Sequence, residues 1–216
     1  MMINRKIKFI TLISFVSLIL CFTVICEAKI RLPSLVSDGM VLQREQNIAV
    51  WGFADSGEEV KVSFLKQNYQ TKADAEGNWK VILAPMKPGG PYSMTINDLE
   101  IKDILIGDVW LCSGQSNMET PMSRVMDLYA DEILSYTNTK IRHIKLPMDY
   151  NFHGSQDNTK PAVWKPVTQE HVLSLTAVPY FFAKYLYKEI DVPIGLINSS
   201  VGGSPDRKST RLNSSH

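Results

Sequence analysis

A serine in a short polar turn is the residue of this sequence whose possible chemistry is most specific. The apolar run 109–112 (VWLC) has the length of a buried strand and ends abruptly at the small and polar residues 113–117 (SGQSN). At the carboxyl edge of a parallel sheet, such turns lift side chains into a crevice, and the first N–H groups of the following helix favour negative charge there. Ser116 is therefore the candidate nucleophile.

A second strand-like segment ends in a similar turn. The apolar residues 192–197 (VPIGLI) are followed by residues 198–204 (NSSVGGS). If both strands lie in one parallel sheet, both turns lie at the same edge and face one crevice. Gly202 and Gly203 allow the close backbone approach that an oxyanion-binding turn needs, although a tight turn would explain the two glycines equally well.

The elements that must position these turns form two predicted parts. Residues 29–103 carry short β-rich runs separated by turn residues, which predicts a β-sandwich-like domain. These runs are 48–54, 60–65, 79–83 and 92–96. From 104 to 205 strand and helix patterns alternate, which predicts an α/β domain with right-handed parallel crossovers.

The α/β part is expected to hold three strands and two helices. The strands are 108–112, 141–146 and 192–197, and residues 149–168 are expected to form a surface loop. One helix should run from Pro121 to about Leu134, and a second should start near Pro179. The second helix carries an apolar stripe at helical spacing that we expect to face the core: Val178, Phe181, Phe182, Tyr185 and Leu186.

Composition narrows the class of protein. The chain has 216 residues, 44% of them hydrophobic and 21% charged, with a net charge of +1, which excludes a strongly basic nucleic-acid-binding protein. Trp51 and Trp79 could form a carbohydrate platform, but their apolar strand neighbours favour core packing.

The first 28 residues have the pattern of a secretory signal peptide. A basic start, an apolar run and small residues before a cut after Ala28 predict export to the periplasm or outside the cell. The alternative is an uncleaved membrane anchor, because the apolar run approaches the length of a spanning helix. Beyond this segment Cys112 is the sole cysteine, so no intramolecular disulfide is possible there, and its apolar strand predicts a buried, unreactive thiol.

The block around Ser116 resembles the nucleophile block of the sialate O-acetylesterase family, within the SGNH (GDSL-like) hydrolase superfamily. Five segments between about residues 30 and 205 carry the resemblance: 32–44 (LPSLVSDGMVLQR), 50–52 (VWG), 89–92 (GGPY), 107–118 (GDVWLCSGQSNM) and 192–200 (VPIGLINSS). Two positions depart from the family pattern, because Thr120 and Val201 stand where the family has Trp. Both changes remove bulk near the expected crevice.

This resemblance implies a fold, a reaction and roles for particular residues. The fold is a β-sandwich-like part followed by a three-layer α/β/α domain, and the reaction is hydrolysis of acetyl esters on a sugar or polysaccharide without metal or cofactor. Ser116 would be the nucleophile, and the N–H groups of Ser116, Gly202 and Gly203 would form much of the oxyanion hole. Gln115 and Asn117 would shape its rim.

The general base implied by the resemblance is missing from the sequence. The family supplies it from an Asp-x-x-His pair, which does not occur here, and we expect His143, His153 and His171 to be structural or solvated. Residues 206–216 (DRKSTRLNSSH) leave the family pattern and resemble a translated sequencing adapter. We therefore expect this chain to be a truncated form of a longer protein, with its native sequence replaced after about Pro205 and the catalytic Asp and His of the full protein beyond that point. On this interpretation His216 is not the base, and the 216-residue chain is expected to be inactive or nearly so and prone to aggregate.

Other functions remain open on the sequence alone. The β-rich part could be a secreted glycan-binding module beside a non-catalytic α/β remnant, or the chain could be a lipid or acyl-CoA esterase of the same superfamily. Among acetylated glycans, the sequence does not separate sialic acid from xylan.

Overall fold

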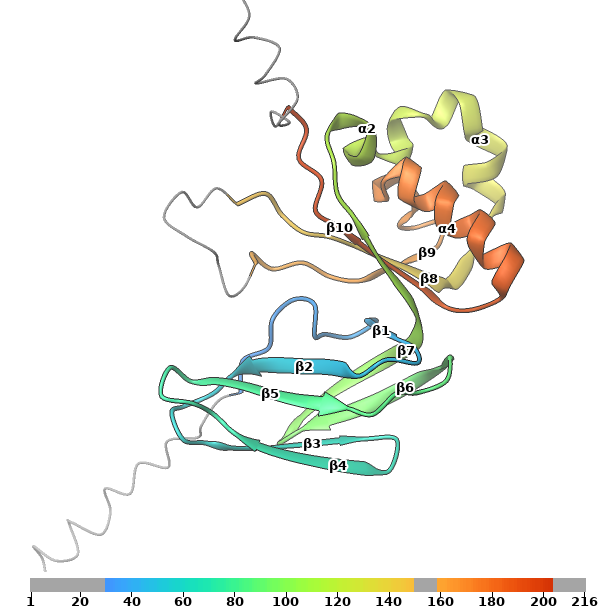
Figure 1. The fold of residues 1–216 in the computed structure, drawn as a ribbon. Coiled ribbons are helices and arrows are strands. Elements are labelled where there is room, and N and C mark those ends of the chain that lie inside the picture. The colour runs from blue at the N-terminus through green and yellow to red at the C-terminus, as the bar shows by residue number, and fades with distance from the viewer. Residues whose placement is uncertain (1–29, 150–158, 204–216) are drawn as a thin grey trace, which may run out of the picture.

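The computed structural model describes residues 30–149 and 159–203 (Figure 1). The predicted signal peptide, His153, His216 and the predicted non-native tail at 206–216 lie outside the described residues. Within the described ranges, no helix combines the length and apolar character needed to cross a membrane.

The described residues from 30 to 112 form seven β-strands. They are β1 (Val41–Gln43), β2 (Ile48–Phe53), β3 (Glu59–Phe64), β4 (Gln67–Lys72), β5 (Asn78–Leu83), β6 (Gly89–Ile96) and β7 (Leu99–Cys112). The four predicted strands are confirmed as β2, β3, β5 and β6. The sequence pattern missed β4, because this strand is polar (QNYQTK), has no buried residue and pairs only with β3 at the end of its sheet.

One apolar core unites these strands. The pair β2–β5 forms a two-stranded sheet, and β4-β3-β6-β7 run side by side in the larger sheet. Alternating residues of β3 and β5 are buried and belong to the same cluster, including Val60, Val62 and Val81. Trp79 is also in this cluster and is 3% exposed, so core packing is confirmed for it. Trp51 is half-buried against the cluster.

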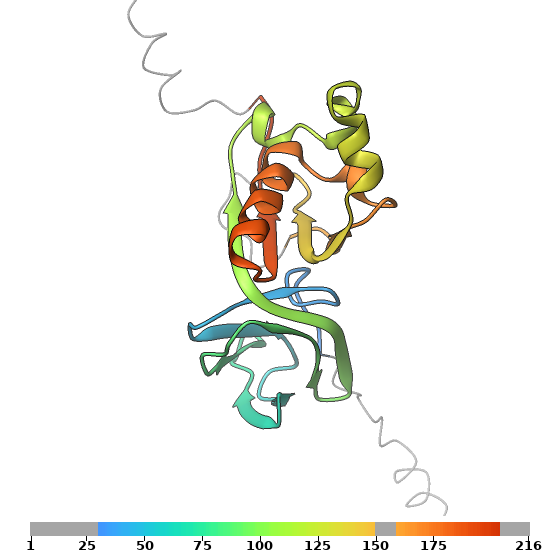
Figure 2. The same ribbon diagram turned by 90° about the vertical axis from the view of Figure 1, so that its right-hand side faces the viewer.

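Strand β7 is longer than predicted and connects the two parts of the molecule. It begins at Leu99 rather than Asp108, and Figure 2 shows it curving from the β-rich part into the helical part. Its first half pairs antiparallel with β6, residues 105–107 pair in parallel with β1, and residues 108–112 pair in parallel with β10 (Ile194–Asn198). The boundary predicted between residues 103 and 104 therefore falls inside a continuous strand.

Two ion pairs hold neighbouring elements against β7. The Arg44 guanidinium donates to both carboxylate oxygens of Asp108, at 2.7 and 3.2 Å. Arg142, which is buried, donates to both oxygens of Asp103, at 2.6 and 2.9 Å. These bidentate contacts fix the direction in which β7 leaves the first core.

The second part is a mixed sheet with helices packed against it. Its strands run in the order β7-β10-β8-β9, with β8 at Asn138–Lys145 and β9 at Lys165–Val167. Strand β10 is parallel to both β7 and β8, as the predicted crossovers require, whereas β9 is antiparallel and lies within the segment predicted to be a loop. The helical elements are α2 (Ser116–Glu119), η1 (Met122–Arg124), α3 (Met126–Ser135), η2 (Val172–Ser174) and α4 (Ala177–Ile190).

The two faces of this sheet contact different cores. Ile141, Ile194 and Leu196 pack into the cluster formed with α3 and α4, which lie on one side of the strands in Figure 1. Ile144 faces the other way and belongs to the cluster of the β-rich part. The sheet is thus shared between the two cores.

The predicted helix from Pro121 to Leu134 is wrong as a single element. The chain instead forms α2, the 3₁₀ turn η1 and α3, with Pro121 extended between the first two. Proline has no N–H to donate to the residue four positions earlier, so α2 ends before it. Helix α3 itself is bent, with non-helical backbone angles at Tyr129.

The predicted inward stripe of α4 is only partly confirmed, because Phe181 and Leu186 are half-buried and pack against the cluster formed with α3. The buried residues of this helix are Ala177, Pro179, Tyr180 and Ala183. Three residues of the predicted stripe are instead exposed to 40% or more: Val178, Phe182 and Tyr185. The helix has apolar residues on more than one face, and Ala183 lies in the core cluster shared with the sheet.

Candidate functional site

Ser116 is the first residue of the short helix α2, four residues after β7 ends. Its side chain is exposed. The turn before it contains Gly114, whose φ of +149° favours glycine. At the other end of the helix, both the N–H and the hydroxyl of Thr120 donate to the Ser116 carbonyl, at 2.9 and 2.7 Å. Thr120, which departs from the family pattern, therefore caps the C-terminal end of α2.

The second predicted turn lies directly beside this one. The Ser199 N–H donates to the Cys112 carbonyl and the Val201 N–H to the Gly114 carbonyl, each at 2.9 Å. A Cβ placed on Gly202 would lie 3.7 Å from the Ser116 Oγ. The structure therefore brings together the candidate nucleophile and the glycine turn, which are 86 residues apart in the sequence.

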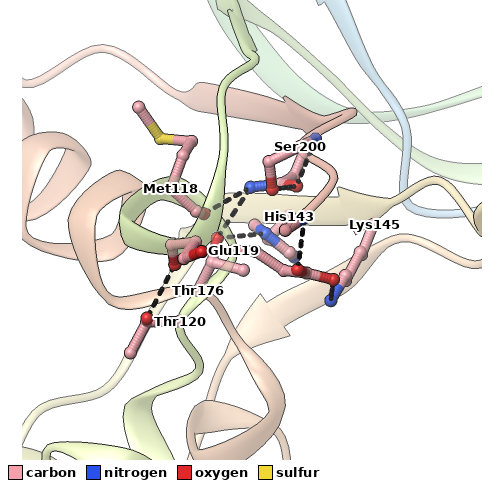
Figure 3. Close-up of polar contacts among 10 residues, drawn as sticks. Met118, Glu119, Thr120, His143, Lys145, Thr176 and Ser200 are labelled. Carbon is pink, nitrogen blue, oxygen red and sulfur yellow. Dashed lines mark hydrogen bonds and ion pairs between the residues drawn. The ribbon is translucent and has the colours of Figure 1, made fainter. Parts of the chain in front are cut away.

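A carboxylate that the sequence did not single out joins the two turns. Glu119 Oε2 accepts a 2.7 Å hydrogen bond from the Gly202 N–H, and Oε1 accepts one of 3.3 Å from the Lys145 Nζ (Figure 3). The Gly202 hydrogen bond, followed by that of Lys145, lowers the pKa of Glu119 from its ordinary value. In this structure the Gly202 N–H thus binds a side chain of the protein itself.

A buried polar network supports the second turn from below. The Asn198 amide donates to the Met118 carbonyl and to the Thr176 hydroxyl, both at 3.1 Å. Its Oδ1 accepts hydrogen bonds from the N–H and the hydroxyl of Ser200, at 3.1 and 2.6 Å (Figure 3). Asn198 therefore links α2, α4 and the turn after β10.

His143 is part of this supporting layer. It is 2% exposed, and its Nε2 lies 3.0 Å from the Thr176 hydroxyl. Burial, followed by the charges of Lys145 and Lys165, lowers its pKa to about 4, so it is neutral at neutral pH. His171 bonds to Thr168 at 3.0 Å in the turn before η2. Within the described ranges, neither imidazole has a hydrogen bond to Ser116. Each was expected to be structural or solvated, and His143 is buried whereas His171 is half-buried.

A cavity of about 350 Å³ opens next to the candidate nucleophile. Its lining is Ser116, Glu119, Thr120, Pro121, Arg124 and Lys145. Two cationic side chains and one carboxylate therefore line the cavity together with Ser116. No cluster of three or more metal-ligating acidic, histidine or cysteine side chains occurs among the residues that the structure describes.

Cys112 is buried directly before the Ser116 turn. Burial raises the pKa of its thiol. The thiol is therefore protonated at neutral pH, as predicted for an unreactive cysteine.

Fold and site together define an α/β protein with an exposed serine at a strand-to-helix turn. A glycine turn after the neighbouring parallel strand lies beside this serine, and many hydrolases position their nucleophiles in this way.

No family model matches the chain. Curated proteins do match: the chain is 31% identical over 196 residues to sialate O-acetylesterase of Rattus norvegicus and 33% identical over 199 residues to that of Homo sapiens. Each match covers 81% of this chain, but 36% and 38% of the respective relatives.

A solved structure agrees with these matches. The crystal structure of a carbohydrate acetylesterase from Xanthomonas citri superposes with a TM-score of 0.78 at 39% identity, over 82% of this chain and 41% of that one. The resemblance to the sialate O-acetylesterase family is therefore confirmed. The chain spans less than half the length of the relatives it matches.

Proposed function

We propose that this chain contains the nucleophile and part of the oxyanion-binding surface of a secreted carbohydrate O-acetylesterase with an SGNH-type α/β/α domain. The observation that supports it most directly is the position of the Ser116 Oγ, exposed between α2 and the Gly202 turn. In this reaction the Oγ attacks the acetyl carbonyl, a general base takes its proton, and the sugar oxygen leaves with a proton. Water then releases acetate from Ser116.

The charges around Ser116 support an acidic sugar as the substrate. The relatives from Rattus norvegicus and Homo sapiens are named for sialate, which carries a carboxylate. Lys145 and Arg124 line the cavity beside Ser116, where they would attract such a carboxylate. Glu119 offsets one of these two charges. We therefore expect faster acetate release from an O-acetylated acidic sugar than from a neutral one.

A chimeric enzyme tests this function. In the Xanthomonas citri acetylesterase, the segment that aligns with this chain is replaced by residues of this chain, so that the remaining elements come from a relative. The chimera should release acetate from O-acetylated sugars, and Ser116→Ala should lower kcat by about a thousandfold or more. The matched control Ser113→Ala, in the same turn, should keep most of the activity.

Two outcomes would contradict the proposal. One is a folded chimera in which Ser116→Ala retains activity, and the other is an inactive chimera beside an active parent. The 216-residue chain alone is expected to hydrolyse p-nitrophenyl acetate no faster than its own Ser116→Ala variant. The reason is that no histidine in the described residues has a hydrogen bond to Ser116.

A further inference from the structure

We propose that Glu119 is a positioning residue of this site, which holds the Gly202 turn beside Ser116 while Lys145 keeps the carboxylate in place. The inference rests on the proposed esterase function, because it concerns the geometry of the oxyanion-binding turn. It assigns no direct contact between Glu119 and the substrate.

Three elements meet at the Glu119 carboxylate. Its own backbone N–H donates to the Gln115 carbonyl at 3.0 Å, which fixes the residue in α2 one turn after Ser116. The two carboxylate oxygens then bind different partners, Gly202 after β10 and Lys145 at the end of β8. Glu119 thus connects α2 both to the turn after β10 and to the end of β8.

The charges that face this carboxylate are favourable. Lys145 from β8 lies at 3.3 Å, and Arg124 from η1 contributes a weaker attraction. The Glu119 side chain is 29% exposed, so these interactions operate partly shielded from water. The carboxylate therefore stays ionised at neutral pH and accepts strongly from the Gly202 N–H.

The two positions of the turn, 202 and 203, require glycine for different physical reasons. A Cβ on Gly202 would lie 2.5 Å from Glu119 Oε2, so this position needs glycine for the close approach of the carboxylate. Gly203 has a φ of +76° with open space around it, so this position needs glycine for its backbone conformation. The tight-turn explanation that the sequence left open therefore applies to Gly203, whereas the close approach at Gly202 is to the Glu119 carboxylate.

The contact also affects which N–H groups can bind an oxyanion. While the Gly202 N–H donates to Glu119, it cannot stabilise the oxygen of a tetrahedral intermediate. Ser116 and Gly203 carry the other two N–H groups expected at this site. Glu119 would then act by setting the position of the turn, and with it the direction of the Gly203 N–H.

NMR spectroscopy of the 216-residue chain tests the contact itself. In the wild type the Gly202 amide proton shift should follow one ionisation below pH 4.5, since the pKa of Glu119 is lowered and the charged form persists above it. In Glu119→Gln this titration should disappear, and in Glu119→Ala hydrogen exchange at Gly202 should accelerate by about tenfold. The matched control Glu170→Gln, at an exposed carboxylate, should leave the Gly202 signal unchanged. A Gly202 shift that is flat with pH and insensitive to Glu119→Gln would overturn the proposal.

Kinetics of the chimera test the consequence for catalysis. Glu119→Ala should lower kcat by roughly tenfold to a hundredfold with little change in KM, and Glu119→Gln, which can still accept from the Gly202 N–H, should recover part of the loss. Circular dichroism and thermal unfolding should show that both variants are folded. If the chimera is active and Glu119→Ala leaves its kcat unchanged, the positioning role of Glu119 is refuted, but the proposed esterase function is not. A chimera that is inactive with Glu119 in place would instead contradict the proposed esterase function.

Discussion

His143 shows how one buried residue beneath the Ser116 turn couples stability to pH. Its pKa is about 4 in the folded chain and near 6.5 when unfolded, because burial disfavours the imidazolium. The unfolded chain thus binds the extra proton between these values, and the free energy of unfolding should fall as pH drops from 6.5 to 4. The loss attributable to this group is about 3 kcal/mol.

Urea unfolding at a series of pH values, for the wild type and for His143→Gln, measures this contribution. Glutamine is neutral throughout, so the variant should lack most of the decline between pH 6.5 and 4, whatever its absolute stability. Equal slopes for wild type and His143→Gln would show that this imidazole is not held neutral by the fold.

Residues of the candidate site could be predicted from the sequence where the pattern of neighbouring residues marked them, but not where their partners come from distant parts of the chain. Ser116 and the turn at Gly202 could be found because each follows an apolar strand-like run. Glu119 could not be found, since its partners Gly202 and Lys145 are brought to it only by the pairing of β10 with β7 and β8. No spacing within the sequence records that pairing.

At the scale of elements, Gly107 sets the course of β7. A Cβ at this position would lie 1.9 Å from the Pro193 carbonyl oxygen, which also accepts the Asp108 N–H at 2.9 Å. Gly107→Ala must therefore push β10 away from β7, and we expect it to lower the free energy of unfolding by about 3 kcal/mol or more.

Thermal and urea unfolding of Gly107→Ala beside Gly89→Ala measure this effect. At Gly89 the added Cβ would meet the hydroxyl of Tyr92, the far end of a side chain that can move, so the cost should be about 1 kcal/mol. If the two variants were equally stable, the close approach of β7 and β10 at Gly107 would not be a rigid feature of the fold.

The predictions of strands and helices were as accurate as the periodicity of apolar residues in the sequence allows. Alternation identified β2, β3, β5 and β6 because their buried residues recur at every second position. Helical spacing identified α4 but misplaced the centre of its buried face, because Tyr180 and Ala183 as well as Val178 and Phe182 fit a helical repeat. Of the predicted stripe, Phe181 and Leu186 do pack against the core. Periodicity shows which residues share a face, and only packing decides which face is buried.

At the scale of the whole molecule, that unexpected orientation of α4 leaves an apolar surface. The surface comprises Trp110 on β7 and three residues of α4, namely Val178, Phe182 and Tyr185, all at least 40% exposed. The rings of Trp110 and Phe182 stack edge to face with centroids 5.0 Å apart, so the surface is continuous between strand and helix. The whole chain has a net charge of only +1, so electrostatic repulsion between copies of the chain is weak and opposes association little.

We therefore expect the 216-residue chain to self-associate through this surface, and a double variant, Val178→Glu with Tyr185→Lys, to reduce that association. The two changes keep the net charge constant, so a reduction must come from loss of exposed apolar area rather than from repulsion. Sedimentation velocity at increasing protein concentration, together with binding of a hydrophobic dye, measures both effects. A control pair in the β-rich part, Ile82→Glu with Leu65→Lys, makes the same charge change at residues that are 50% and 40% exposed. If the control pair suppressed association as strongly as the α4 pair, the association would not be specific to the surface formed by Trp110 and α4.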